Sequence, residues 1–133
     1  MPDRHLSWIG VNHFSPEEFS SPDMPESGYF IHPLLVVICE RVRNEYGAPV
    51  KINSGVRSIA HNKSVGGTEN SAHLIKDGVG NAIDVSCTNS RLRFIILDTA
   101  IRSGIKRIGI GENFIHLDTD NSLDQEVIWH YYK

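Results

Sequence analysis

The amino-acid sequence predicts an α+β fold, a single domain in which a small, mostly antiparallel sheet packs against helices. Residues 33–46 and 90–103 have helical periodicity, and the strand candidates do not alternate regularly with them. With 133 residues, 40% of them apolar and 22% charged, the chain has the size and composition of one compact domain. We expect one domain over residues 1–133, with residues 1–31 as an N-terminal extension packed on it.

Both long helices have recognisable ends and one apolar face each. Gly47 is placed to end the helix at residues 33–46, and Gly104 to end the helix at residues 90–103. The residues expected to face the core are Leu35, Ile38, Cys39, Val42 and Tyr46 in the first helix, and Leu92, Ile95, Ile96, Thr99 and Ala100 in the second.

A short helical turn is predicted near the start of the chain. Ser15 has the place of an N-cap, Pro16 that of the first helical residue, and Glu18 that of the acid in a capping box. Phe14 and Phe19 flank this turn and are expected to fix it to the core. The strand candidates elsewhere in the chain are residues 50–53, 106–110, 114–118 and 127–131.

The middle of the chain contains a predicted β-hairpin. The pair Asp77-Gly78 is a strong signal for a two-residue hairpin turn. Counting back along both arms places His73 opposite Ala82. Asp84 would then point to the same face as His73, at a separation of roughly 7–8 Å.

Three separated residues predict a metal site: His73, Asp84 and His116. Two imidazoles and one carboxylate leave the fourth position of a tetrahedral zinc ion open for water, which is the arrangement of a catalytic site. A structural site would normally be closed by four ligands, usually with cysteines. Cys39 and Cys87 form no CxxC pattern, and we expect both to be free, packed thiols.

Two carboxylates are candidates for the general base. Asp118 lies two residues after His116 on a predicted strand, so both side chains should point to one face. Asp118 would then accept the proton of a zinc-bound water, or orient a ligand from outside the metal's coordination shell. Glu112, which lies in a predicted turn, is the rival base.

Composition and charge exclude several classes of function. The net charge is −3 and no stripe of Lys and Arg is present, which argues against nucleic-acid binding. No apolar run reaches transmembrane length, so we expect no membrane insertion. The N-terminus lacks the pattern of a secretory signal peptide, and we expect synthesis in the cytoplasm and a monomeric protein.

Seven motifs follow one another along the chain between residues 53 and 118, and the resemblance that they carry covers nearly the whole chain, including the opening at residues 14–19 and the close at residues 127–129. They are Asn53-Ser54-Gly55-Val56-Arg57-Ser58, His61-Asn62, Val65-Gly66-Gly67, Ser71-Ala72-His73, Gly80-Asn81-Ala82-Ile83-Asp84, Arg107-Ile108-Gly109-Ile110-Gly111 and Phe114-Ile115-His116-Leu117-Asp118. This ordered set resembles the M15 zinc peptidases. It is most similar to the D-Ala-D-Ala carboxypeptidase-like branch, which includes many phage and bacterial murein peptidases.

The resemblance implies a hedgehog/D-Ala-D-Ala-peptidase-like fold with His73, Asp84 and His116 as zinc ligands. It assigns to Arg57 the binding of substrate or the polarisation of the scissile carbonyl. The implied partner is the peptidoglycan stem peptide, cut by a carboxypeptidase or by an endopeptidase. A phage endolysin or a virion lytic protein is expected, acting at the cell wall after release or as part of a virion.

The chain departs from the family pattern at two positions. The spacing between His73 and Gly80 is four residues longer than in the usual family motif. Relatives also place a catalytic acid three residues before the last histidine, and that position is Asn113 here. The expected base is therefore Asp118, with Glu112 second. The alternative function is a catalytically inactive, zinc-containing binding or structural module of a phage particle or cell wall.

Overall fold

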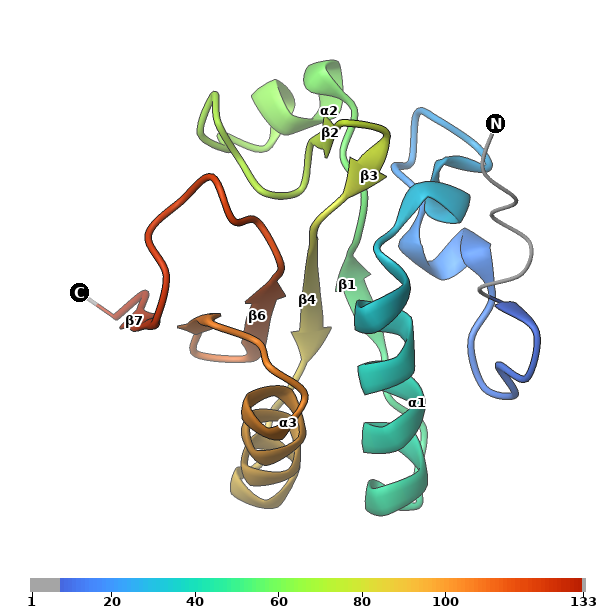
Figure 1. The fold of residues 1–133 in the computed structure, drawn as a ribbon, viewed down its shortest axis with the longest axis vertical. Coiled ribbons are helices and arrows are strands. Elements are labelled where there is room, and N and C mark those ends of the chain that lie inside the picture. The colour runs from blue at the N-terminus through green and yellow to red at the C-terminus, as the bar shows by residue number, and fades with distance from the viewer. Residues whose placement is uncertain (1–7, 133) are drawn as a thin grey trace.

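The computed structural model describes residues 8–132 and has an α+β fold, as the sequence predicts (Figure 1). Its main sheet has five strands in the order β1-β4-β6-β5-β7, and every neighbouring pair is antiparallel except β5 and β7. The strands are β1 (Ile52–Ser54), β4 (Ala82–Ser86), β5 (Arg107–Ile110), β6 (Phe114–Asp118) and β7 (Val127–His130).

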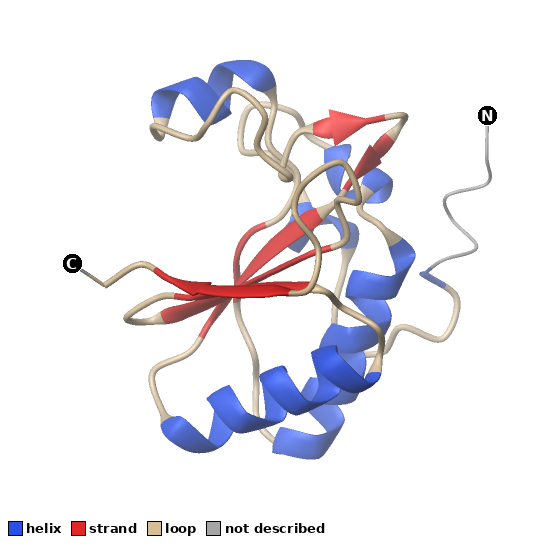
Figure 2. Cartoon of the chain, turned by 60° about the vertical axis from the view of Figure 1, so that its left-hand side comes forward, coloured by secondary structure: helices blue, strands red, loops and turns tan. Residues whose placement is uncertain are grey.

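Helices cover one face of this sheet. The two long helices, α1 (Pro33–Tyr46) and α3 (Ser90–Arg102), lie together on that face, whereas α2 (Ile59–Ser64) lies beyond the opposite face (Figure 2). A small second sheet, β2 (Ile75–Lys76) with β3 (Val79–Gly80), lies on the same side as α2. Within residues 8–132, none of the helices is long and apolar enough to cross a membrane.

Local signals define the ends of the long helices. The His32 ring accepts the backbone N–H of Leu34 at 3.1 Å and so caps the start of α1. Gly47 ends α1 with a φ of 73°, a left-handed conformation that glycine adopts at little cost. Asn89 caps α3 by accepting the N–H of Leu92 at 2.8 Å. The predicted inward residues of both helices are buried, except Tyr46, which is partly buried.

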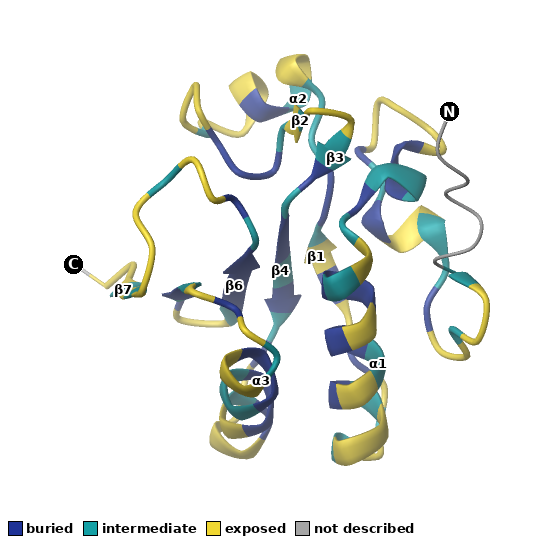
Figure 3. Cartoon of the chain, viewed as in Figure 1, coloured by how far each residue is buried: buried dark blue, intermediate teal, exposed yellow. Residues whose placement is uncertain are grey.

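The central strands alternate between the core and the open face of the sheet. Ile83, Ile115 and Leu117 are completely buried in the core that also contains the inner faces of α1 and α3 (Figure 3). Successive residues of a strand point to opposite faces, so Asp84 and His116 point away from the helices. The same strands therefore supply apolar residues to the core and polar residues to the other face.

The N-terminal segment is part of this core. Phe19 is completely buried, with its ring 5.6 Å from that of Trp8 and 6.0 Å from that of Phe14. The capping box predicted for the turn η2 (Pro16–Phe19) forms, and the Glu18 carboxylate accepts the N–H of Ser15 at 2.9 Å. A second short turn, η3 (Ser27–Phe30), follows. Residues 1–7 of the expected extension lie outside the described residues.

The predicted hairpin turn is confirmed. Asp77 and Gly78 both have positive φ angles, 52° and 78°, as the tight turn favoured in hairpins requires. Lys76 pairs with Val79 across it. The spacing between His73 and Gly80 is four residues longer here than in the family motif. The turn Asp77-Gly78 and the pair Lys76 and Val79 account for this number of residues.

The expected pairing of His73 with Ala82 is wrong. The hairpin ladder ends at the pair Ile75 and Gly80, because from Ala82 onward the chain pairs with β1 and β6 in the main sheet. The preceding arm turns toward a different partner, and the carbonyl of His73 accepts the backbone N–H of Arg57 at 2.9 Å. His73 nevertheless reaches the open face of the sheet.

Both cysteines are free and buried, as predicted. Burial raises the pKa of the Cys39 thiol far above its usual range, and it raises the pKa of Cys87 as well. The two thiols therefore act as small apolar side chains of the core.

Replacing Phe19 with Ala should lower the free energy of unfolding by about 3–5 kcal/mol, because the change empties a fully buried ring site. Urea denaturation of both proteins measures this loss. Phe94→Ala is the matched control, since the Phe94 ring on α3 is 70% exposed, and it should cost less than about 1 kcal/mol. Equal losses at the two positions would contradict the placement of the N-terminal segment in the core.

Candidate metal centre

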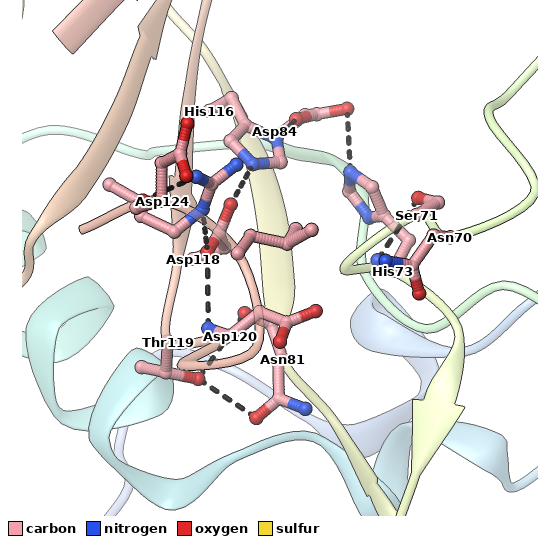
Figure 4. A network of polar contacts seen from close by, with 12 residues as sticks. Asn70, Ser71, His73, Asn81, Asp84, His116, Asp118, Thr119, Asp120 and Asp124 are labelled. Atoms are coloured by element: carbon pink, nitrogen blue, oxygen red, sulfur yellow. Dashed lines mark hydrogen bonds and ion pairs between the residues drawn. The ribbon is translucent and has the colours of Figure 1, made fainter. Parts of the chain in front are cut away.

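Three polar side chains converge on the open face of the sheet: His73, Asp84 and His116. Each offers one donor atom, and these three atoms all lie within 4.8 Å of one another. Asp84 bridges the two imidazoles, with Oδ2 3.4 Å from Nε2 of His73 and Oδ1 2.9 Å from Nδ1 of His116 (Figure 4). Two imidazoles and a carboxylate form a donor set that suits a divalent transition-metal ion. The cluster can therefore hold a metal ion.

Strand pairing brings two of these residues together. Asp84 on β4 lies directly opposite His116 on β6 in the antiparallel ladder. The Cβ atoms of such a pair lie about 4.5–5.5 Å apart, although the two residues are far apart in the sequence. This half of the cluster thus needs no loop to form it.

His73 enters from outside the main sheet and is held by its own hydrogen bond. Its Nδ1 lies 2.7 Å from the carbonyl oxygen of Gly55, which can only accept. In the neutral form that binds a metal ion, the ring of His73 therefore carries its proton on Nδ1 and offers the lone pair of Nε2 on the side of Asp84. A hydrogen bond at the second nitrogen is the usual way in which proteins orient a metal-binding histidine.

Asp118 orients His116 in the same manner. Its Oδ2 lies 2.7 Å from Nε2 of His116, which confirms that both side chains lie on one face. The other carboxylate oxygen accepts from Nε of Arg107 at 2.8 Å and from the backbone N–H of Asp120 at 3.1 Å. The Asp118 side chain has no exposed surface. These contacts leave Nδ1 of His116 free to face Asp84.

In the metal-free protein, electrostatic interactions favour an ionised Asp84 beside a protonated His116. Burial opposes ionisation of Asp84, but hydrogen bonds from His116 and His73 outweigh it and hold the pKa of Asp84 well below its usual range. Burial also disfavours the charged form of His116, but Asp118 and Asp84 outweigh it and raise the pKa of His116. A metal ion that binds here must displace a proton from His116, so its binding weakens as the pH falls.

Arg57 lies beside the cluster, where the sequence resemblance expects it. Its Nη2 is 3.5 Å from Oδ2 of Asp84. Its Nε donates to Ser54 at 3.3 Å, and Nη1 donates to the side-chain oxygen of Asn62 at 3.2 Å. Three partners from separate segments thus fix the guanidinium next to the candidate ligands.

Glu112 is not brought to the cluster. It is exposed in the turn between β5 and β6 and is not among the residues that line the cavity at the metal centre. Within residues 8–132, the carboxylates that line this cavity are those of Asp84 and Asp118. The structure thus separates the two base candidates, with Asp118 touching a candidate ligand and Glu112 at a distance from all three.

A cavity of about 580 Å³ opens over the cluster. One wall is aromatic and was not foreseen from the sequence: Phe114 on β6, Trp129 on β7 and Tyr131 just beyond it line the cavity. The ring of Trp129 lies 5.4 Å from that of His116, and the ring of Tyr131 lies 5.1 Å from that of Phe114. The metal centre therefore lies against a continuous group of rings.

Glycine at position 109 makes this aromatic wall possible. Gly109 on β5 pairs with His116 on one side and with Trp129 on the other. A Cβ atom at this position would lie 2.7 Å from Nε1 of Trp129 and 2.8 Å from Tyr131. The alternation of Arg107 and Gly109 along β5 is the sequence signal that could have placed both on the face of the metal centre.

A second unforeseen contact ties the hairpin to the rim of the cavity. Nζ of Lys76 lies 2.5 Å from Oδ2 of Asp120 and donates to the carbonyl of Asn70 at 3.0 Å. Asp120 is 3% exposed and also accepts the N–H of Ser122 at 3.0 Å. Lys76 thus joins the segments on two sides of the cavity, and it lies in the stretch that lengthens this chain relative to the family pattern.

Comparison with known families identifies the class of protein. The model of the peptidase M15 family matches residues 12–118, which is most of the chain and includes His73, Asp84, His116 and Arg57. The chain belongs to this family and is thus a peptidase; members of the family are typically zinc-dependent. Trp129 and Tyr131 lie beyond the matched residues. A search of curated proteins found no match.

Replacing Asp120 with Asn should lower the free energy of unfolding at pH 7 by about 1–3 kcal/mol, because Lys76 loses its buried partner. Burial raises the pKa of Asp120, but hydrogen bonds from Lys76 and Ser122 outweigh it and hold the pKa below its usual range. The stabilisation by ionised Asp120 is therefore complete above about pH 4, the pKa of an unfolded aspartate. It is lost as the pH falls through the lower folded value.

Urea denaturation of wild type and variant between pH 7 and pH 2 measures this difference. The control is Asp98→Asn on α3, which removes an exposed ion pair with Arg102 and should change stability by less than about 0.5 kcal/mol. A gap between wild type and Asp120→Asn that stays constant down to pH 2 would show that the charge of Asp120 contributes nothing.

Proposed function

We propose that this peptidase is a zinc-dependent metallopeptidase that hydrolyses peptide bonds of bacterial cell-wall peptidoglycan. The observation that carries the proposal is the convergence of three residues in the lining of one cavity: His73, Asp84 and His116. Both imidazoles are held by hydrogen bonds at the ring nitrogen that does not face Asp84. Membership in the peptidase M15 family supports the same reaction.

The three donor residues fit a catalytic zinc ion. They provide two nitrogens and one oxygen and leave a coordination position for a fourth, non-protein ligand. A zinc ion bound there supplies a water of pKa near 7 and polarises the carbonyl of the peptide bond. The protein contributes the orientation, because the carbonyl of Gly55 fixes the ring of His73 and the carboxylate of Asp118 fixes that of His116.

Arg57 is proposed to stabilise the negative charge that develops on the substrate carbonyl. Its guanidinium lies next to Asp84 and lines the same cavity. Because Ser54 and Asn62 hold it in place, little reorganisation is needed as the charge develops. A fixed cation in a partly dry cavity is worth more than the same cation in water.

For Asp118, we favour the orienting role over that of general base. Its carboxylate is enclosed and already bound by His116, Arg107 and the N–H of Asp120. Glu112 remains the second candidate base, and it reaches the cavity only if the turn between β5 and β6 moves.

The substrate and the place of action rest on the sequence resemblance to murein peptidases. The proposed partner is the peptidoglycan stem peptide, and the proposed place of action is the cell wall. The protein would reach it after release from the cytoplasm as a phage endolysin, or as part of a virion.

The second candidate function is a zinc-containing binding or structural module without activity. One observation favours it: Asn113 occupies the position of the family's catalytic acid, and neither carboxylate lining the cavity in residues 8–132 is free of other contacts. Binding of peptidoglycan fragments without release of products would support this alternative.

Replacing His73 or His116 with Ala should lower the zinc affinity by at least about 100-fold and abolish hydrolysis, because each change removes one of three ligands. Zinc binding is measured by competition with a chelator, and products released from purified peptidoglycan by mass spectrometry. His61→Ala is the matched control and should bind zinc as wild type does, because His61 lies on α2 and is not among the residues that line the cavity. Full activity of either ligand variant would exclude this metal site.

Asp118→Asn and Glu112→Gln distinguish the orienting residue from the base. Loss of the carboxylate charge beside Nε2 of His116 should weaken zinc binding by about 10–100-fold in Asp118→Asn, and turnover should fall with it. If Glu112 is the base, Glu112→Gln should keep the zinc affinity and lose about 100-fold or more in kcat. Zinc titrations and steady-state rates at saturating zinc separate the two effects. Wild-type zinc affinity in Asp118→Asn would remove the orienting role.

A further inference from the structure

We infer that Asn62 is a positioning residue, whose side-chain amide joins the guanidinium of Arg57 to the segment of residues 65–68 at the rim of the cavity. This rim segment, all of which lines the cavity, thereby controls where the guanidinium lies. The inference rests on the proposed function and assigns the control of Arg57 to a residue that is not itself part of the cavity lining.

Asn62 is a buried polar residue on a helix that is otherwise largely exposed. It is 4% exposed, whereas Ile59, Lys63 and Ser64 on the same helix α2 are exposed to solvent. Burying an amide is costly unless its donors and its acceptor find partners. The position of Asn62 therefore directs attention to the groups that its amide binds.

The two ends of the Asn62 amide bind different parts of the chain. Its Oδ1 accepts from Nη1 of Arg57 at 3.2 Å, and its Nδ2 donates to the backbone carbonyl of Thr68 at 2.8 Å. These partners fix the orientation of the amide, because a guanidinium only donates and a carbonyl only accepts. The backbone carbonyl of Asn62 also accepts the N–H of Gly67 at 2.9 Å. Two contacts thus tie Asn62 to the rim segment, and one ties it to Arg57.

Glycine at position 67 gives this amide its space. A Cβ atom at Gly67 would overlap Oδ1 of Asn62 and would lie 3.0 Å from Nη1 of Arg57. The φ angle of Gly67 is not positive, so space and not backbone conformation accounts for a glycine here. The rim segment, the amide and the guanidinium therefore pack as one unit.

The contacts of Arg57 leave donors for a substrate, and their direction depends on Asn62. A guanidinium has five N–H groups, and the contacts with Asp84, Ser54 and Asn62 occupy three of them. One N–H remains on each terminal nitrogen of a side chain that lines the cavity. A displacement of about 1 Å in such a group can lower a reaction rate by about 100-fold. The hydrogen bond from Asn62 restrains Nη1 against this displacement.

A double-mutant cycle on the full, zinc-loaded chain tests the inference. The probes are a stem pentapeptide and a cross-linked stem dimer, and products are measured by liquid chromatography and mass spectrometry. Arg57→Gln should lower kcat by about 100-fold, and Asn62→Ala by about 10-fold or more. In the Arg57→Gln background, Asn62→Ala should cost less than about twofold, because the group that it positions is already gone. In Asn62→Ala alone, KM and zinc affinity should stay within about threefold of wild type.

Gly67→Ala is a second variant that removes no atom of Asn62 or Arg57. Its methyl group displaces the amide from Nη1, so it should reproduce the loss of kcat. This variant carries the test if Asn62→Ala does not fold. The matched control is Asn44→Ala, at an exposed position of α1 on the other face of the sheet (Figure 2), and its kcat should stay within about twofold of wild type.

An equal loss of kcat from Asn62→Ala with and without Arg57 would overturn the inference. Wild-type kcat in both the folded Asn62→Ala protein and Gly67→Ala would do the same, as would a loss of zinc affinity in Asn62→Ala, which would place the effect at the metal site.

A readout that needs no activity separates this inference from the proposed function. The Nε–H signal of Arg57 in ¹⁵N NMR spectra, assigned by its absence in Arg57→Gln, should shift or broaden in Asn62→Ala and Gly67→Ala but not in Asn44→Ala. If wild type releases no more product than His116→Ala, the proposed function fails, and a changed signal would still support the link between Asn62 and Arg57. An unchanged signal in both variants would remove that link.

Discussion

The pairing of β4 with β6 is the constraint on which the rest of the structure depends. Its register places Asp84 opposite His116 on one face, and it places Ile83 opposite Leu117 on the other. A shift of one residue would exchange the two faces, burying charged groups under the helices and separating the candidate ligands. The burial of apolar residues against α1 and α3 therefore fixes the geometry of the metal centre, although no ligand belongs to the core.

Much of the fold and the candidate ligands could be predicted from the sequence, because these features depend on local patterns. Helix α1 begins and ends where its periodicity and Gly47 indicate, and β6 has the predicted bounds. The route of His73 could not be predicted, since it depends on a backbone contact with Arg57, which is far away in the sequence. The aromatic wall was missed for the same reason: Trp129 approaches His116 only through the parallel pairing of β7 with β5.

Paired charges give the open face of the sheet its rigidity. Asp84 pairs with Arg57, Asp118 with Arg107, and Asp120 with Lys76, so each of these three carboxylates has a cation beside it. Breaking such a pair by removing one partner leaves a poorly solvated charge, which favours a single arrangement of the side chains. The same arrangement orients His116 and holds Arg57 beside the candidate ligands.

The central claim is that His73, Asp84 and His116 together bind one zinc ion and leave it accessible to substrate. Anomalous diffraction from crystals of the zinc-loaded protein, recorded on both sides of the zinc absorption edge, tests this most directly. The account predicts one strong peak bonded to Nε2 of His73, a carboxylate oxygen of Asp84 and Nδ1 of His116, with no fourth protein ligand. A peak elsewhere, or a shell closed by a fourth side chain, would contradict it.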